Sequence, residues 1–212
     1  HEVNGVATSR LLKAAIKKKV GRFIYISTIH VYGSKLAGII NEDSPTLATH
    51  PYATSHLSGE VAVLDENKKG NIKGIVVRIS NAFGAPIQNN VNCWMLLVNN
   101  LCKQAINNQK LVLNSSGIQK RDFVTLTSAC RAIIHLIDCN IDNLDNCLFN
   151  IGGNWAPSIL EMTKKFAQRY ASLTGELLEI KKHKDDKFSY SDSLDYRTDK
   201  LRSIGFVPGK DN

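Results

Sequence analysis

Two short apolar runs separated by a helix-length segment constrain the fold of this chain most strongly. Residues 23–27 (Phe-Ile-Tyr-Ile-Ser) and 75–79 (Ile-Val-Val-Arg-Ile) are almost continuously apolar, which is typical of parallel strands buried on both faces of a sheet. Between them, residues 51–67 begin with Pro51, a residue that suits the first turn of a helix. Strand, helix and strand in this order predict a right-handed crossover in a doubly wound parallel sheet.

The flanking segments extend this α/β pattern. We expect a helix over about residues 3–19, closed at Gly21, because glycine is favoured just after a helix C-terminus. The further predicted elements are helices near 92–107 and 127–139, a strand over 149–153, and a helix from Ser158 to about Tyr170. Ser158 and Glu161 have the spacing of a capping box, which opens a helix by satisfying two backbone N–H groups.

Charge and cysteine usage narrow the class of protein. The net charge of +8 is concentrated in Lys17–Lys19 and in residues 181–187; it favours an anionic small substrate over nucleic acid, because no aromatic residues are interleaved with the basic ones. No apolar run approaches the roughly 20 residues of a membrane span. Five cysteines without a Cys-x-x-Cys pair predict reduced thiols in a cytoplasmic protein and no metal site.

Several motifs then occur in order along the chain. They are Ser-Thr-Ile-His-Val-Tyr-Gly at 27–33, Pro-Tyr-Ala-Thr-Ser-His at 51–56, Arg-Ile-Ser-Asn-Ala-Phe-Gly at 78–84, Gly-Ile-Gln-Lys-Arg-Asp-Phe-Val at 117–124, Phe-Asn-Ile-Gly-Gly at 149–153, and a tail over 197–208. Together they resemble the extended short-chain dehydrogenase/reductases, the NAD-dependent epimerase/dehydratase family. The chain is similar to the UDP-galactose 4-epimerase-like members of that family.

The resemblance implies a fold and a division of the chain. The fold class is α/β, with a partial doubly wound Rossmann-type parallel sheet and a small mixed α/β C-terminal substrate-binding region. Residues 1–84 would form the C-terminal half of the dinucleotide-binding domain. Residues 85–212 would form mainly the substrate-binding region, with some segments returning to the sheet. Members of the family often form homodimers, so a homodimer is possible here.

The resemblance also implies NAD as the cofactor, with NADP possible. The family grips the pyrophosphate with a glycine-rich loop after its first strand, and these 212 residues contain no Gly-x-x-Gly-x-x-Gly motif. Half of such a sheet would leave an apolar edge exposed, which proteins avoid. We therefore expect either that the loop and partner strands lie outside this sequence or that the chain does not bind NAD.

The catalytic residues implied by the resemblance are Tyr52, Thr28 and His56. Tyr52 would accept a proton from a sugar hydroxyl while hydride passes to NAD, and Thr28 would share that hydrogen bond. The family places a lysine four residues after the tyrosine to lower the pKa of the tyrosine and to bind the nicotinamide ribose, and His56 stands there. A neutral imidazole supplies no such field, so we expect a weakened base. Ser27, Tyr52 and His56 would contact the cofactor.

Thr28, Asn81 and Arg121 would bind the substrate, a nucleotide sugar. Asn81 would touch the diphosphate and Arg121 would clamp it, because a guanidinium group matches phosphate oxygens. Dehydratases of the dTDP-glucose 4,6-dehydratase type carry Asp-Glu where this chain has Ile29 and His30, so elimination of water is disfavoured. His30 is either a site residue or a solvent-facing loop residue.

The resulting hypothesis is an NAD-dependent nucleotide-sugar epimerase or oxidoreductase. Two alternatives stay open. One is an NAD(P)-dependent reductase of another small carbonyl substrate. The other is a non-catalytic homologue that binds a nucleotide or a partner, because both the glycine-rich loop and the lysine are absent from these residues.

Overall fold

A three-stranded parallel sheet forms the centre of the molecule. The computed structural model describes residues 2–88, 90–141, 144, 146–183 and 193–207. The sheet has the strand order β1 (Arg22–Thr28), β3 (Lys73–Ile79) and β7 (Leu148–Ile151), all parallel. The two predicted apolar runs are therefore neighbouring strands, and the predicted α/β fold with a doubly wound parallel sheet is confirmed.

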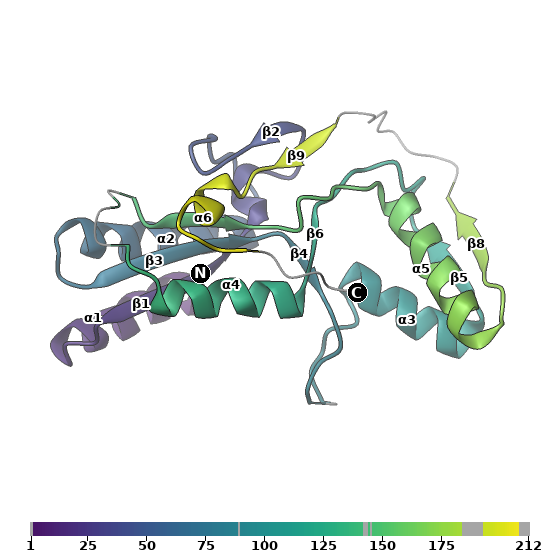
Figure 1. Cartoon of the computed structure of the whole chain (residues 1–212), viewed down its shortest axis with the longest axis horizontal. Helices are drawn as coiled ribbons and strands as arrows, with labels where there is room; N and C mark the ends of the chain where they lie inside the picture. The colour runs from purple at the N-terminus through teal and green to yellow at the C-terminus, as the bar shows by residue number, and fades with distance from the viewer. Residues whose placement is uncertain (1, 89, 142–143, 145, 184–192, 208–212) are drawn as a thin grey trace.

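Helices cover both faces of this sheet, which is why its strands are almost continuously apolar. On one face, α1 (Thr8–Lys17) and α2 (Pro51–Lys68) pack against β1 and β3 around Leu12, Val63 and Val76. On the other face, α4 (Leu126–Asp138) and α6 (Asp199–Ser203) cover β3 and β7. Figure 1 shows α4 running along the sheet with α6 beside it.

The helices predicted from periodicity and caps are present, with shifts at their ends. The segment expected as one helix from residue 3 begins with a π-helical turn, η1 (Glu2–Ala7), before α1. The helix expected near 92–107 is α3 (Leu97–Asn108), which begins later. The predicted capping box at Ser158 opens α5 (Ile159–Thr174), which Gly175 ends with a φ of 77°.

A second, smaller group of elements lies at the other end of the molecule (Figure 1). It consists of α3, α5 and the parallel pair β5 (Lys110–Leu113) and β8 (Glu179–Lys182). Leu101 and Ala105 of α3 pack on Leu111 and Ile159 in a core of their own. This group of elements has its own apolar core and lies apart from the central sheet.

Two further pairs of short strands lie beside the central sheet. β4 (Asn81–Phe83) follows β3 directly and pairs in parallel with β6 (Phe123–Thr125). β2 (Gly38–Ile40) pairs with β9 (Leu194–Tyr196), close to the 3-10 turn η2 (Ile29–Tyr32) that follows β1. The chain therefore turns out of the sheet at the carboxyl ends of β1 and β3, where ligands bind in open α/β sheets.

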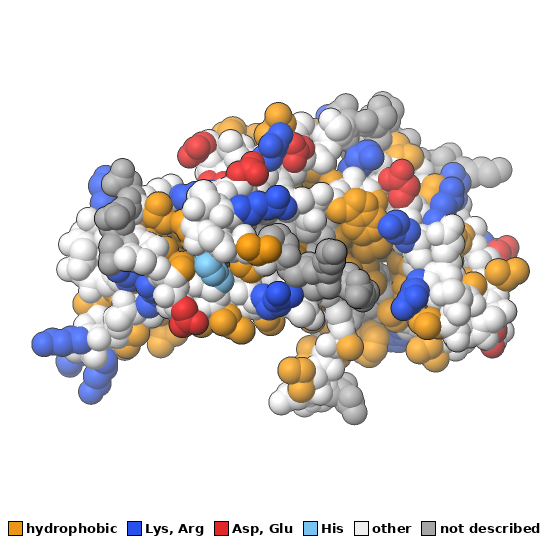
Figure 2. Space-filling view, viewed as in Figure 1, with side chains coloured by type: hydrophobic (Ala, Val, Ile, Leu, Met, Phe, Trp, Pro, Cys, Tyr) orange, Lys and Arg blue, Asp and Glu red, His pale blue; other side chains and the backbone are white. Residues whose placement is uncertain are grey.

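Figure 2 shows Lys and Arg side chains scattered over this face, with acidic and apolar ones between them. All five cysteines are free. Within the described ranges, no helix is long and apolar enough to cross a bilayer.

Candidate functional site

A cavity of about 800 Å³ opens at the carboxyl ends of β1 and β3. Its first wall is formed by the end of β1, the η2 turn and the start of α2, and its second by the segment after β3 and the segment before β6. Five of the six site residues predicted from the sequence line it: Ser27, Thr28, Tyr52, Asn81 and Arg121.

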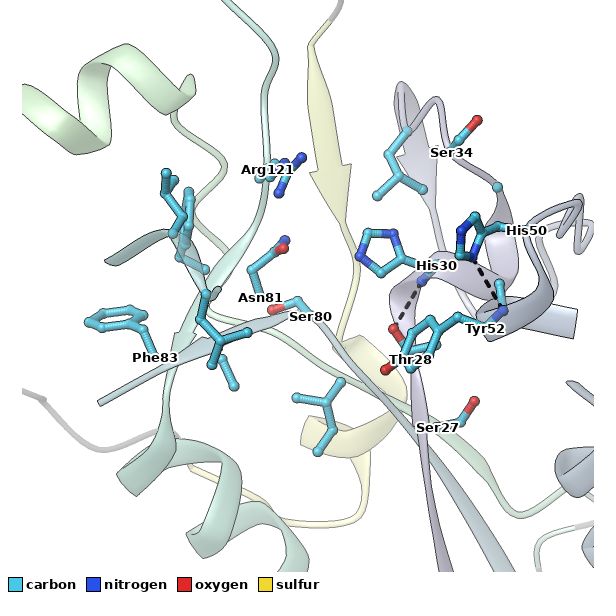
Figure 3. Close-up of a pocket in the computed structure, with 18 of the residues that line it drawn as sticks. Ser27, Thr28, His30, Ser34, His50, Tyr52, Ser80, Asn81, Phe83 and Arg121 are labelled. Atoms are coloured by element: carbon cyan, nitrogen blue, oxygen red, sulfur yellow. Dashed lines mark hydrogen bonds between the residues drawn. The ribbon is translucent and has the colours of Figure 1, made fainter. Parts of the chain in front are cut away.

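The first wall holds Tyr52 and Thr28. Tyr52 occupies the first turn of α2 behind Pro51, and the N-cap His50 accepts the Tyr52 N–H at Nδ1 over 3.2 Å. The Tyr52 side chain is 49% exposed, while Thr28 is buried. Thr28 ends β1, and its Oγ1 accepts the backbone N–H of His30 at 3.3 Å. In Figure 3 both hydroxyl-bearing side chains face the cavity from this wall.

The opposite wall holds Asn81 and Arg121. Asn81 Nδ2 donates to the Asp122 carbonyl at 2.9 Å, which ties the start of β4 to the segment before β6. Arg121 Nη2 donates to Gln119 Oε1 at 3.2 Å, and burial lowers the pKa of this guanidinium. Figure 3 shows both side chains across the cavity from Tyr52. The Arg121 guanidinium has lost part of its hydration through burial. An anion bound in the cavity could replace that water with charge-assisted hydrogen bonds.

Asp122 has a structural position. Its carboxylate is fully buried and accepts the backbone N–H groups of Gly153 and Trp155 at 2.9 and 3.2 Å. Burial raises the pKa of this carboxyl to about 6, against the hydrogen bonds that it accepts. Asp122 therefore holds the loop after β7 against β6 rather than facing the cavity.

His56 is the one predicted site residue that does not line the cavity. Its ring lies edge-on to Tyr52, with 4.7 Å between ring centroids, and its Nδ1 lies 3.3 Å from the Tyr25 hydroxyl. Burial lowers the pKa of His56, although Glu60 acts in the opposite direction. The imidazole is therefore neutral above the ordinary histidine pKa and touches Tyr52 from behind the cavity wall.

Ser27 lines the cavity, and its hydroxyl is engaged by a neighbouring buried residue. The Ser27 hydroxyl donates to the carboxylate of Glu60, and Arg78 binds the same carboxylate through Nη2 at 2.6 Å. All three residues are buried. A cofactor contact through Ser27 would thus use its main chain, or its hydroxyl oxygen as an acceptor.

Four residues add detail that the sequence did not supply. His30 lines the cavity, in line with the site-residue alternative, whereas Ile29 is 1% exposed and packs in the core beside Tyr196. His50 and Tyr25 were missed. The sequence could have indicated Tyr25. Residues two apart on a strand share a face, so Tyr25 lies on the same face of β1 as Ser27.

Comparison with known proteins identifies the family. Residues 1–152 match the profile described as "NAD dependent epimerase/dehydratase family". The chain is 26% identical to dTDP-D-glucose 4,6-dehydratase of Bos taurus over 208 residues, covering 97% of this chain and 56% of that protein. It is 27% identical to the Homo sapiens enzyme of the same name over 208 residues, covering 97% and 57%. The chain therefore spans little more than half the length of these relatives.

Solved structures show the same fold. UDP-glucuronic acid 4-epimerase from Bacillus cereus, in complex with UDP-glucuronic acid and NAD, superposes with a TM-score of 0.78 at 24% identity, over 97% of this chain and 62% of that one. UDP-N-acetylglucosamine 4-epimerase from Methanobrevibacter ruminantium superposes with a TM-score of 0.80 at 18% identity, over 99% and 64%.

Proposed function

The chain belongs to the NAD dependent epimerase/dehydratase family, and from that premise we propose that it carries the catalytic and sugar-binding part of an NAD-dependent nucleotide-sugar epimerase or oxidoreductase. One observation carries the proposal. Tyr52 and Thr28 on one wall and Asn81 and Arg121 on the other line a single cavity, so a proton acceptor and an anion clamp face the same substrate.

Tyr52 is the base in this proposal. Its half-exposed side chain projects from the first turn of α2, where the helix N-terminus favours a developing negative charge. Thr28 is buried beside it and offers a hydroxyl that both donates and accepts. Thr28 would hold the reacting sugar hydroxyl while Tyr52 takes its proton, leaving a keto group on the sugar.

NAD fits the part of the site that these residues form. Ile26 is 52% exposed although it lies within β1, and it lines the cavity next to Ser27, which makes an apolar platform for a flat nicotinamide ring. When bound there, NAD supplies a hydride acceptor. The 212 residues contain no glycine-rich loop for the pyrophosphate, so we assign only the nicotinamide end of a cofactor site to them. The same contacts suit NADP.

The replacement of lysine by His56 weakens the base in this proposal. The neutral imidazole behind Tyr52 contributes no fixed charge to favour the tyrosinate. The neutral His56 imidazole also supports the alternative of a non-catalytic homologue that binds a nucleotide. A measurement of turnover decides between the enzyme and the non-catalytic homologue.

Substrate would bind through its diphosphate. Arg121 would contact the phosphate oxygens with its guanidinium, and Asn81 would add a side-chain amide from β4. Epimerisation or oxidation is favoured over dehydration although the two relatives described above are named as dehydratases. Ile29 cannot exchange a proton, and its side chain is buried in the core away from the cavity.

The experiment uses the complete protein that contains these residues. Binding of NAD, UDP and dTDP is measured by calorimetry, and turnover of the corresponding glucose and galactose esters by product analysis. Tyr52→Phe should lower kcat by a factor of roughly 10² to 10⁴ with unchanged dissociation constants. Tyr170→Phe is the matched control, because Tyr170 lies on α5 outside the cavity.

Three outcomes separate the hypotheses. Nucleoside diphosphate binding without turnover in the wild type favours the non-catalytic homologue. Turnover that survives Tyr52→Phe refutes the assignment of the base. Absence of nucleoside diphosphate binding overturns the proposal.

We also propose a cytoplasmic location, which the five free cysteines support. We further propose that the protein forms a homodimer, which light scattering would test.

A further inference from the structure

Two histidines in the cavity have no role in the proposed reaction. His30 lies on the η2 turn and His50 at the N-cap of α2, and both line the cavity beside Tyr52. In Figure 3 the imidazole of His30 stands between His50 on one side and Asn81 and Arg121 on the other. The ring of His30 also meets that of Tyr52 edge-on, with 6.5 Å between centroids.

The permanently charged residues that line this part of the cavity are both basic. They are Arg121 and Lys120 from the segment before β6, and Lys120 lies 3.9 Å from Glu161, which is outside the lining. His30 and His50 on the opposite wall add positive charge when they are protonated. Among the described residues that line the cavity, none is an aspartate or a glutamate. A cavity of this kind lacks the carboxylate acceptors that bind the hydroxyl groups of a neutral sugar, and it favours a ligand with negative charge.

The hydrogen-bonding capacity of His50 points the same way. Its Nδ1 accepts the Tyr52 N–H, so in the neutral imidazole the proton is on Nε2, which is then a donor only. The complementary ligand group is one that only accepts. A carboxylate and a phosphate both meet that requirement, whereas a hydroxyl group leaves its own proton without an acceptor at this nitrogen. Because the diphosphate is assigned to Arg121, the group left for the histidines is a carboxylate.

We propose that His30 and His50 form a subsite for a carboxylate on the sugar ring, so that the substrate is a nucleoside diphosphate uronic acid. The inference rests on the proposed function and gives it a substrate class. Arg121 then takes the diphosphate, and the histidines take a second anion nearer to Tyr52.

The subsite has a pH dependence that can be measured. Burial, then Arg121 and then His50 lower the pKa of His30, so its imidazole is neutral in the empty cavity at neutral pH. Lys120 and Tyr52 are the other titratable groups on these walls. A bound carboxylate raises the pKa of His30 again, so binding takes up a proton and is tighter in acid.

The test compares the glucose and glucuronate esters of whichever nucleoside diphosphate, UDP or dTDP, binds in the experiment above. Calorimetry on the complete protein at about pH 6 and about pH 8 brackets the ordinary histidine titration. The glucuronate ester should bind on the order of tenfold more tightly than the glucose ester at the lower pH, a preference that shrinks at the higher pH. Buffers of different ionisation enthalpy should report proton uptake for the glucuronate ester only.

His30→Gln keeps a hydrogen-bond donor but cannot be charged, and it should remove both the preference and the proton uptake. His183→Gln is the matched control, because His183 is exposed and lies outside the cavity. Equal weakening of both esters and of the free nucleoside diphosphate in His30→Gln would assign the histidines to the diphosphate and overturn the carboxylate subsite. Equal wild-type affinity for the two esters would also overturn it, while leaving the proposed function intact.

Discussion

His56 shows how much a single residue can change the chemistry of this site. The Tyr25 hydroxyl lies 3.3 Å from His56 Nδ1 and 3.1 Å from the Asn4 carbonyl, to which it donates. A hydroxyl that gives its only proton to a carbonyl offers its oxygen as an acceptor to the imidazole. The surroundings of His56 thus tolerate a proton on Nδ1, even though burial lowers its pKa.

Replacement of His56 by lysine should restore the missing charge. The ammonium group would lie beside Tyr52 and stabilise its anion, so we expect kcat to rise by roughly tenfold for each pKa unit by which the tyrosine is shifted. The optimum should move to lower pH. In the wild type the same charge is present only in acid, because the lowered pKa of His56 leaves it neutral at higher pH.

The measurement is the pH profile of kcat for the complete protein. His56→Gln is the control, since an amide keeps hydrogen bonding at the same position without charge, and it should resemble the wild type at high pH. A lysine variant that binds NAD normally and shows the wild-type rate and optimum would contradict this account of the base.

At the scale of secondary-structure elements, contacts between the start of β6 and the loop after β7 fix the second wall of the cavity. Asp122 accepts two backbone N–H groups from the loop after β7, and its own carbonyl accepts from Asn81. The backbones approach closely here, because a Cβ atom on Gly153 would collide with the carbonyl oxygen of Phe123. The position of Asn81 therefore depends on contacts between elements that are far apart in the sequence.

Gly153→Ala should destabilise the protein, since the collision is with backbone and no side chain can move away. We expect a loss of about 1–3 kcal/mol of unfolding free energy, the usual cost of overpacking, and weaker binding of the nucleoside diphosphate. Gly21→Ala is the control, because nothing lies within 4 Å of a Cβ at that position, and its effect should stay within about 1 kcal/mol. Urea denaturation measures both variants, and equal stability of the two would refute the argument.

The elements differ in how far the sequence predicted them. Long helices carry their signals locally, as Ser158 and Pro51 do for α5 and α2. The strands β5 and β8 contain four residues each and exist through pairing with one another. A strand of four residues is too short to show a clear alternation of apolar and polar residues. The sequence therefore did not reveal that β5 and β8 pair with each other.

At the scale of the whole molecule, one buried ion pair joins the layers on the α2 side of the site. Glu60 of α2 binds Arg78 of β3 through Oε2 at 2.6 Å and also accepts from Ser27 of β1. The guanidinium lies 4.6 Å from the centroid of the Tyr32 ring, and the Arg78 carbonyl accepts the Tyr196 hydroxyl at 2.8 Å. The helix, both strands and the β9 segment are thereby held together.

Removal of one partner of this pair should be costly, because the other charge stays buried. We expect Glu60→Gln to lower the unfolding free energy by about 3–5 kcal/mol. The double variant Glu60→Leu with Arg78→Met should lose much less, because a buried ion pair is often replaced by apolar side chains with little loss. Chemical denaturation of both proteins tests this, and a double variant as unstable as the single one would contradict it.

The sequence by itself determined the family, the parallel sheet and the identity of the residues that meet at the cavity. Apolar runs, caps and motifs are local signals, and five of the six predicted site residues line the same cavity. Their catalytic and binding roles stay predictions.

Only the tertiary structure decided which way the side chains turn. It placed His30 in the cavity and buried Ile29 beside it, set His56 behind the wall, and engaged the Ser27 hydroxyl with Glu60. These outcomes depend on packing and hydrogen bonds between segments distant in the chain, such as Glu60 with Arg78, and no local pattern encodes them.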